Sequence, residues 1–202
     1  MKKLIVEFIG TMFLVVIIGL TGDAIAIGFG LMALVYMGGH ISGAHYNPAV
    51  SLAILLRGKI TIGEMFQYWA AQIAGALIGA GISTWLNDAA TPVAVGAGRT
   101  VVEALAAEIL FTFALASVVL NVATAKSNAG NSFYGLAIGF TVLVGAVSVG
   151  SISGGAFNPA VSIGHNVFAK NWTDIWIHIV GPCIGAAVAA SVFRMTSTGD
   201  FD

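Results

Sequence analysis

The chain has 202 residues, of which 58% are hydrophobic and only 8% charged, and its formal net charge is -1. A soluble domain carries about a quarter charged residues, so this chain has too little polar surface to face water and we expect lipid around it. The near-neutral charge argues against a nucleic-acid partner, and the single Cys183 excludes a disulfide framework or a thiolate metal cage.

Six apolar segments approach the roughly 20 residues that a helix needs to cross a bilayer. Polar and turn-forming residues separate them, so each is expected to cross once. The sequence therefore predicts an all-α integral membrane protein. The predicted spans are Leu4–Leu20, Ala24–Gly39, Ile62–Leu86, Val101–Ala123, Phe133–Val149 and Ile175–Phe193.

The basic residues are unevenly distributed between the two ends of these spans. If the N-terminus is cytoplasmic, most of them lie on that side: Lys2, Lys3, Arg57, Lys59, Lys126 and Arg194. Only Arg99 and Lys170 then lie outside, which is the bias that the positive-inside rule describes. We therefore expect a multi-pass protein of a cell membrane, inner or plasma, with both termini cytoplasmic.

Two further apolar segments, Val50–Leu56 and Val161–Phe168, are too short to cross a bilayer. Each follows a Pro, which suits the first turn of a helix, and the preceding strings repeat one another: Ser-Gly-Ala-His-Tyr-Asn-Pro-Ala at 42–49 and Ser-Gly-Gly-Ala-Phe-Asn-Pro-Ala at 153–160. One domain, 1–202, is thus predicted as two repeats, about 1–98 and 99–202. Three crossings and one half-helix per repeat require the two copies to be inserted in opposite orientations.

Two Asn-Pro-Ala boxes in inverted repeats resemble the aquaporins, or major intrinsic proteins. The resemblance covers essentially the whole chain. It implies a bundle of six transmembrane helices with two re-entrant half-helices, assembled as a homotetramer with one pore per subunit and without a cofactor. The implied function is a passive channel for water and other small uncharged solutes, not an enzyme.

The boxes also have a physical explanation. Pro fits the first helical turn and Asn the N-cap, where its carbonyl binds the helix and its amide N–H groups remain free for a passing oxygen. Each helix N-terminus adds about half a positive charge, which repels cations. The predicted box residues are Asn47, Pro48, Ala49, Asn158, Pro159 and Ala160.

Two glutamates, Glu7 and Glu108, lie inside predicted spans, where a carboxylate by default suggests a proton relay or ion site. The family resemblance instead implies that they hold the re-entrant loops in place, and that His45 braces the first loop. We interpret the other histidines as loop or interfacial residues, and find no third convergent ligand that would make a metal site. These histidines are His40, His165 and His178.

Seven glycines within the spans are interpreted as small-residue contacts that let helix backbones approach closely. They are Gly10, Gly19, Gly75, Gly79, Gly139, Gly181 and Gly185.

The selectivity filter departs from the common family pattern. In most aquaporins an aromatic stands about twenty residues before the first box Asn, two residues stand twelve and three before the second, and an Arg stands three after it. The matching residues here are Ile27, Ala146, Gly155 and Val161. None has a polar side chain, so we expect a wider and drier constriction. Glycerol facilitators match poorly, because they keep the Arg and two aromatics and carry an Asp in place of Ser162.

Three other functions remain open. A broad neutral-solute channel would pass ammonia, glycerol, urea or hydrogen peroxide, with water secondary, because an apolar filter discriminates by size. A non-conducting structural membrane protein would share the same motifs. An ion or proton channel would need charged rings or a chain of titratable residues, and two isolated glutamates favour it least.

Overall fold

The computed structural model describes residues 1–200, and every regular element within them is helical. Two short 3-10 turns, Lys126–Asn128 and Thr198–Asp200, accompany the α-helices. The α-helices are α1 (Lys2–Thr21), α2 (Ala24–Ser42), α3 (Pro48–Leu56), α4 (Ile62–Asn87), α5 (Val101–Thr124), α6 (Tyr134–Ser153), α7 (Pro159–Ala169) and α8 (Ile177–Thr196).

Six of these helices, all but α3 and α7, are long and apolar enough to cross a membrane, which confirms the predicted spans. Three spans extend about a turn further than expected: α2 continues past Gly39, α6 past Val149 and α8 past Phe193. Of these, α2 and α6 end instead at a glycine in the left-handed conformation, Gly43 (φ 92) and Gly154 (φ 87). Glycine adopts this conformation without steric cost and commonly caps the C-terminus of a helix. The two helices therefore continue past the point at which the sequence becomes less hydrophobic.

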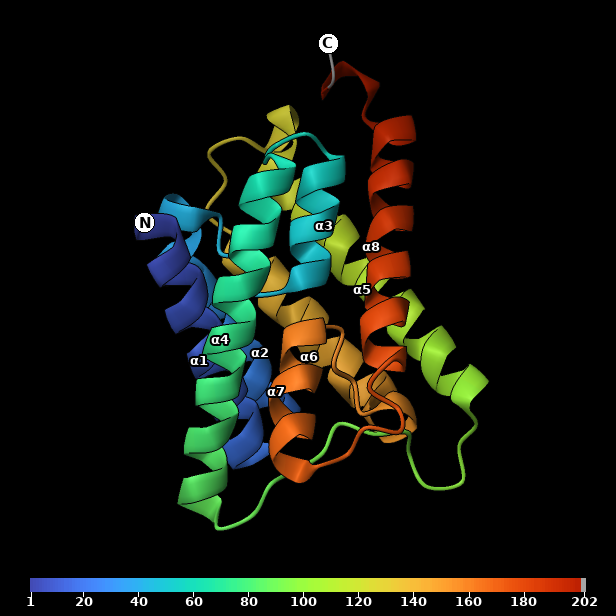
Figure 1. Ribbon diagram of the computed structural model, residues 1–202. Helices are drawn as coiled ribbons and strands as arrows, with labels where there is room; N and C mark the ends of the chain where they lie inside the picture. Colours follow the sequence, from blue (N-terminus) through green and yellow to red (C-terminus); the bar gives the residue numbers. More distant parts are fainter. Residues whose placement is uncertain (201–202) are drawn as a thin grey trace.

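The helices pack in the same way in the two halves of the chain. α1 packs chiefly against α4, α5 packs against α8, and α2 and α6 meet across the bundle. The short helices α3 and α7 lie in opposite halves of the bundle with their N-terminal ends toward its middle (Figure 1). Neither spans the bundle alone, and together they cover its full depth.

Small residues make these close approaches possible. A Cβ added to Gly75 on α4 would collide with the carbonyl oxygen of Phe8 on α1, and one added to Gly185 on α8 would collide with that of Ile109 on α5. All seven glycines predicted as helix contacts have a neighbouring atom closer than 3.0 Å to the position of such a Cβ. Gly75, Gly79, Gly139 and Gly185 meet the backbone of a neighbouring helix, which confirms their predicted role. Gly10, Gly19 and Gly181 instead meet side chains, and the side chain beside Gly10 is that of Tyr46 in the first loop.

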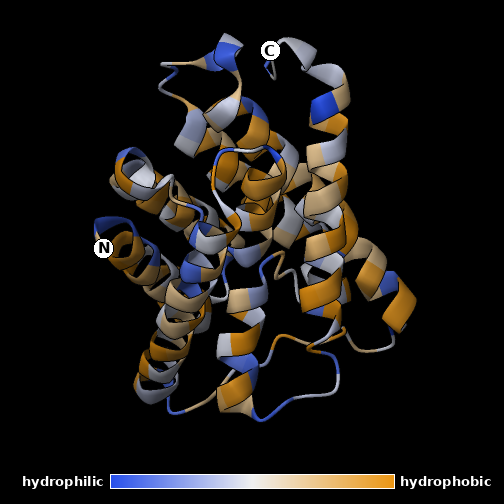
Figure 2. Ribbon diagram, turned by 45° about the horizontal axis from the view of Figure 1, so that its top comes forward, coloured by the Kyte–Doolittle hydropathy of each residue, from blue (hydrophilic) through white to orange (hydrophobic). Residues whose placement is uncertain are grey.

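The outer surface of the bundle is apolar and polar groups are enclosed. Side chains such as Leu110 and Val147 are 62% and 68% exposed, whereas Glu7 and Glu108 are fully buried. Figure 2 shows hydrophobic colouring along most of the helices, with hydrophilic residues at their ends and in the loops. A protein surrounded by lipid has this distribution, because buried polar groups must find partners inside the protein.

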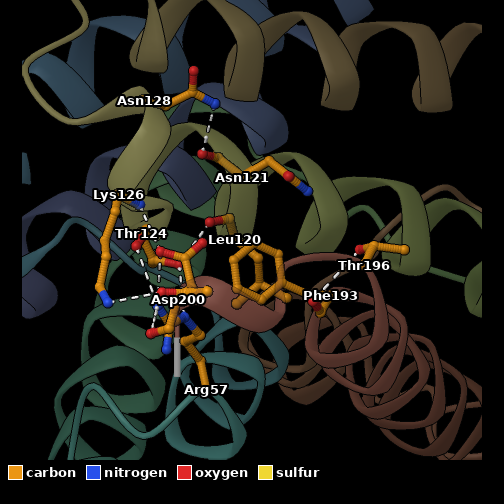
Figure 3. A network of polar contacts seen from close by, with 10 residues as sticks. Arg57, Leu120, Asn121, Thr124, Lys126, Asn128, Phe193, Thr196 and Asp200 are labelled. Atoms are coloured by element: carbon orange, nitrogen blue, oxygen red, sulfur yellow. Dashed lines mark hydrogen bonds and ion pairs between the residues drawn. The ribbon is translucent and has the colours of Figure 1, made fainter. Parts of the chain in front are cut away.

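Arg57, at the end of α3, is one of the basic residues that the positive-inside rule assigns to the cytoplasmic side, but it is buried and not a solvated loop charge. Its side chain is 4% exposed and forms an ion pair at 3.6 Å with Asp200. The guanidinium also lies 5.1 Å from the ring centroid of Phe193, and Asp200 accepts a 2.7 Å hydrogen bond from the backbone N–H of Lys126. The turn Thr198–Asp200 thereby connects the ends of α3, α5 and α8 (Figure 3).

Both ends of the described chain pack against the segment that joins α3 to α4. Lys3 forms an ion pair at 3.5 Å with Glu64 at the start of α4, while Asp200 holds Arg57 at the end of α3. The two termini therefore lie on the same side of the bundle, in the upper half of Figure 1.

Candidate solute pathway

The two box asparagines cap their helices and bind each other's loops. Asn47 precedes α3 and Asn158 precedes α7, and the side-chain oxygen of each accepts the backbone N–H two residues later, at 2.8 and 3.0 Å. The amide nitrogen of Asn47 donates to the carbonyl of Phe157 at 2.7 Å, and that of Asn158 donates to the carbonyl of Tyr46 at 2.9 Å. Each amide therefore commits one N–H to the opposite loop and retains one, where two free N–H groups were expected.

The backbone before each box is turned in the same unusual way. Tyr46 and Phe157 directly precede the asparagines, and both have positive φ values, 50° and 47°. Ala44 and Gly155, two residues earlier, also have positive φ, 50° and 61°. Such angles are costly for residues with a side chain, so the surrounding contacts must hold the loops in this shape.

Glu7 supplies the contacts that hold the first loop. Its Oε1 accepts hydrogen bonds from the Ser42 hydroxyl at 2.7 Å and from the backbone N–H of His45 at 2.9 Å. Its Oε2 accepts from the backbone N–H of Tyr46 at 2.7 Å and from the Gln72 amide at 2.8 Å. Both carboxylate oxygens are therefore engaged by donors of the loop and of α4.

Glu108 holds the second loop in a similar way. Its Oε1 accepts from the Ser153 hydroxyl at 2.7 Å and from the backbone N–H of Ala156 at 3.1 Å, and its Oε2 accepts from the backbone N–H of Phe157 at 2.8 Å. His178 lies beside it, with Nε2 2.6 Å from the carbonyl of Ser153. The expectation that His178 is a loop or interfacial residue is therefore wrong, because it is fully buried within α8.

His45 lies between the first loop and the helices behind it. Its Nδ1 is 3.0 Å from the Ser51 hydroxyl on α3, and its ring centroid is 4.9 Å from that of Tyr68 on α4. The Tyr68 hydroxyl in turn donates to the carbonyl of Ser42 at 2.7 Å. The imidazole is thus braced on two sides while one edge faces the interior passage.

The interior of the bundle contains two cavities that share wall residues. The first, of about 350 Å³, is lined by both box asparagines and by all four residues at the predicted filter positions, Ile27, Ala146, Gly155 and Val161. The second, of about 390 Å³, opens toward Lys3 and Lys59. Their linings share His45 and Val119, so the two cavities lie side by side: the first reaches the loop between α4 and α5, and the second reaches the segment after α3.

His165 also lines the first cavity, which corrects its interpretation as a loop or interfacial residue. It lies within α7 and is 3% exposed, whereas His40, at the end of α2, is exposed as expected. The spacing of α7 contained the signal: Val161 and His165 are four residues apart and share one helix face, so a residue predicted to face the pore implies the other.

Two supporting residues were missed altogether. Gln72 donates to Glu7 and, at 3.0 Å, to the Ser51 hydroxyl, and Asn166 binds the loop between α4 and α5. Gln72 follows Tyr68 by four residues and precedes Gly75 and Gly79 on the packed face of α4, which is the pattern that indicates its direction. Among residues 1–200, no group of three His, Cys, Asp or Glu side chains is arranged to hold a metal ion.

Six membrane-spanning helices, two facing half-helices and a passage between them define a membrane channel. The family model described as Major intrinsic protein matches residues 18–193. The chain therefore belongs to the major intrinsic protein family. It is a multi-pass membrane protein and a passive channel for water and small solutes, and it is not an enzyme.

Individual relatives agree with this assignment. The chain is 39% identical over 177 residues to a probable aquaporin TIP2-2 of Oryza sativa subsp. japonica, covering 87% of this chain and 71% of the relative. It is 34% identical over 211 residues to aquaporin NIP1-1 of Zea mays, covering 96% and 74%. The X-ray structure of the aquaglyceroporin from Plasmodium falciparum has the same fold, with a TM-score of 0.84, 22% identity and coverage of 100% and 99%.

Proposed function

We propose that this channel conducts water and small uncharged solutes, and that the paired Asn-Pro-Ala boxes exclude ions. The observation that carries the proposal is the exchange of hydrogen bonds between the boxes: Asn47 binds the carbonyl of Phe157, and Asn158 binds that of Tyr46. The exchange fixes both amides on the wall of one cavity. The N–H that each amide retains is available to a water or hydroxyl oxygen in transit.

Cations are excluded at this point for two reasons. The N-termini of α3 and α7 meet here, and each contributes about half a positive charge to the passage. A bare cation would also lose its hydration without finding a carboxylate, because Glu7 and Glu108 point their oxygens at loop N–H and hydroxyl groups. A neutral solute meets neither penalty.

The filter residues favour breadth over strict water selectivity. Ile27, Ala146, Gly155 and Val161 line the cavity without a polar side chain among them, so size is their main criterion. We infer that ammonia, urea, hydrogen peroxide and glycerol follow water at decreasing rates. A channel in which one of these solutes matters more than water is the second candidate, and the same apolar lining favours it.

The names of the similar proteins fit this range. The two plant relatives are named aquaporins, and the structural neighbour is named an aquaglyceroporin. We further propose a homotetramer, as the family resemblance implies, in a cell membrane with both termini cytoplasmic. The excess of Lys and Arg on the side of the termini supports that orientation.

Stopped-flow light scattering on proteoliposomes tests the proposal. Vesicles with the protein should shrink faster than protein-free vesicles after an impermeant osmotic shock, and should reswell when the osmolyte is urea or glycerol. Potassium and sodium fluxes should stay at the protein-free level. Water and solute rates equal to those of protein-free vesicles would establish a non-conducting structural protein, and a cation flux would refute exclusion at the boxes.

A further inference from the structure

The loop between α4 and α5, residues 88–100, forms part of the wall of the first cavity. Thr91, Pro92 and Val93 line it together with the predicted filter residues. Val93 is 7% exposed, and a Cβ placed on Gly154 would lie only 3.0 Å from its Cγ1. The isopropyl group of Val93 therefore covers the backbone of Gly154, immediately beside the filter position Gly155.

A buried amide on α7 holds Val93 in this place. The side-chain oxygen of Asn166 accepts a hydrogen bond from the backbone N–H of Val93 at 3.0 Å, and its amide nitrogen donates to the carbonyl of the same residue at 2.9 Å. The amide nitrogen also donates to the Ser162 hydroxyl at 3.1 Å. Asn166 is fully buried, and it matches both backbone groups of one residue as a neighbouring strand would.

A second attachment fixes the far side of the loop. The backbone N–H of Gly96 donates to the carbonyl of Ile152 at 2.9 Å, and a Cβ at Gly96 would collide with the carbonyl oxygen of Ser151. The loop is thus joined to the end of α6 as well as to α7. With both attachments in place, Val93 has little freedom to leave the cavity wall.

We propose that Val93 is a specificity-determining residue of the outer constriction and that Asn166 is its positioning residue. Ala146 and Gly155 are small and leave space in the passage, and Val93 reduces that space from the loop side. Val93 contributes only an apolar surface to the wall. It therefore limits the size of the neutral solutes that pass, and it offers them no hydrogen-bond partner. The inference rests on the proposed conduction of neutral solutes.

Val93→Ala tests the first half, with Val147→Ala on the outer face of α6, away from the cavity, as the matched control. The readout is the ratio of glycerol to water permeability in proteoliposomes of equal protein content. We expect Val93→Ala to raise this ratio by roughly threefold or more, as the removal of wall methyl groups implies. Val147→Ala should leave it at the wild-type value. An unchanged ratio in Val93→Ala would overturn the inference, whereas a wild type without water permeability would overturn the proposed function itself.

Asn166→Leu tests the second half, because it keeps the branched shape of the side chain and removes all three of its hydrogen bonds. Ser162→Ala is its control, since it removes one bond of Asn166 and leaves both bonds to Val93. The glycerol-to-water ratio should rise in Asn166→Leu and not in Ser162→Ala. In the double variant Val93→Ala/Asn166→Leu, the glycerol-to-water ratio should rise no further than in whichever single variant raises it more, because both changes act through the side chain of Val93.

Two results would show that Asn166 does not position Val93: additive increases in the double variant, or an unchanged ratio in Asn166→Leu. If Asn166→Leu does not assemble, the ratio in Asn166→Gln decides: a rise there supports the positioning role and the wild-type value refutes it.

Discussion

The side-chain amide of Asn47 donates a 2.7 Å hydrogen bond to the carbonyl oxygen of Phe157, 110 residues further along the chain. Asn158 returns the same contact to Tyr46 at 2.9 Å. The N-terminal ends of two short helices from different halves of the chain are thereby joined at the point where the cavity passes between them. The joint is structural and functional at once, because the same two amides line the passage.

Replacing Asn47 with Ala should therefore destabilise the protein before it changes selectivity. The variant loses the N-cap of α3, at about 1 kcal/mol, and leaves the carbonyl of Phe157 without its partner, at about 1–3 kcal/mol. The apparent melting temperature in detergent should fall clearly. Asn121→Ala is the control, because that exposed side chain bonds only the carbonyl of Ser117 on its own helix. Equal melting temperatures for the two variants would refute the joint between the boxes.

The loop-holding role of the buried glutamates predicts that Glu7→Gln reduces assembly. The NH₂ group of a glutamine must face one of the groups that now donate a hydrogen bond to Glu7. A buried N–H then has no acceptor, which destabilises the fold by about 1–3 kcal/mol. The yield of solubilised oligomer and the water permeability should fall together. Glu103→Gln should behave as wild type, because glutamine preserves the capping box with Thr100. Normal assembly of Glu7→Gln with a solute flux newly dependent on pH would indicate a proton relay instead.

The buried ion pair between Arg57 and Asp200 should contribute a large coupling energy to the stability of the protein. Both side chains are less than a tenth exposed, so solvent screens them little. A double-mutant cycle with Arg57→Gln and Asp200→Asn should give a coupling of about 1–3 kcal/mol in thermal or denaturant unfolding. The half-exposed pair Arg99 and Glu103 should show no measurable coupling in the same experiment. Zero coupling for the buried pair would mean that the C-terminal turn does not fasten α3.

The parts of the fold that depend on local signals could be predicted from the sequence. Pro48 and Pro159 mark the starts of the half-helices because Pro suits the first turn of a helix and each stands before an apolar segment that is too short to span, and hydrophobicity locates the six crossings. Hydropathy alone predicts ends for α2 and α6 that are too early, because it declines before Gly43 and Gly154, whose left-handed conformation ends the helices. The cap is a backbone property that a hydropathy window does not register.

The supporting residues of the passage could not be predicted, because their partners are distant in the chain. Asn166 binds Val93 across 73 residues, and Gln72 binds Glu7 across 65. The spacing of Gln72 indicates that it faces the packed side of α4, but no pattern near either residue identifies its partner. The buried position of His178 escapes sequence reasoning for the same reason, since its partner Ser153 lies 25 residues away at the end of another helix. Helix spacing indicates the direction of two of these side chains: His165 lies four residues after Val161, and Gln72 lies four residues after Tyr68.

The most direct test of the account is the permeability of Val161→Arg beside the wild type. Val161 is 2% exposed and lines the cavity, so an Arg there would narrow the passage and add hydrogen-bond donors and a positive charge. The measurement is glycerol and urea reswelling together with water shrinkage in proteoliposomes, with a pH-sensitive dye to follow proton leak. We predict that Val161→Arg lowers glycerol and urea permeability and any proton leak, while water permeability changes comparatively little. Equal glycerol and urea permeability in the two proteins would contradict an apolar constriction at this residue.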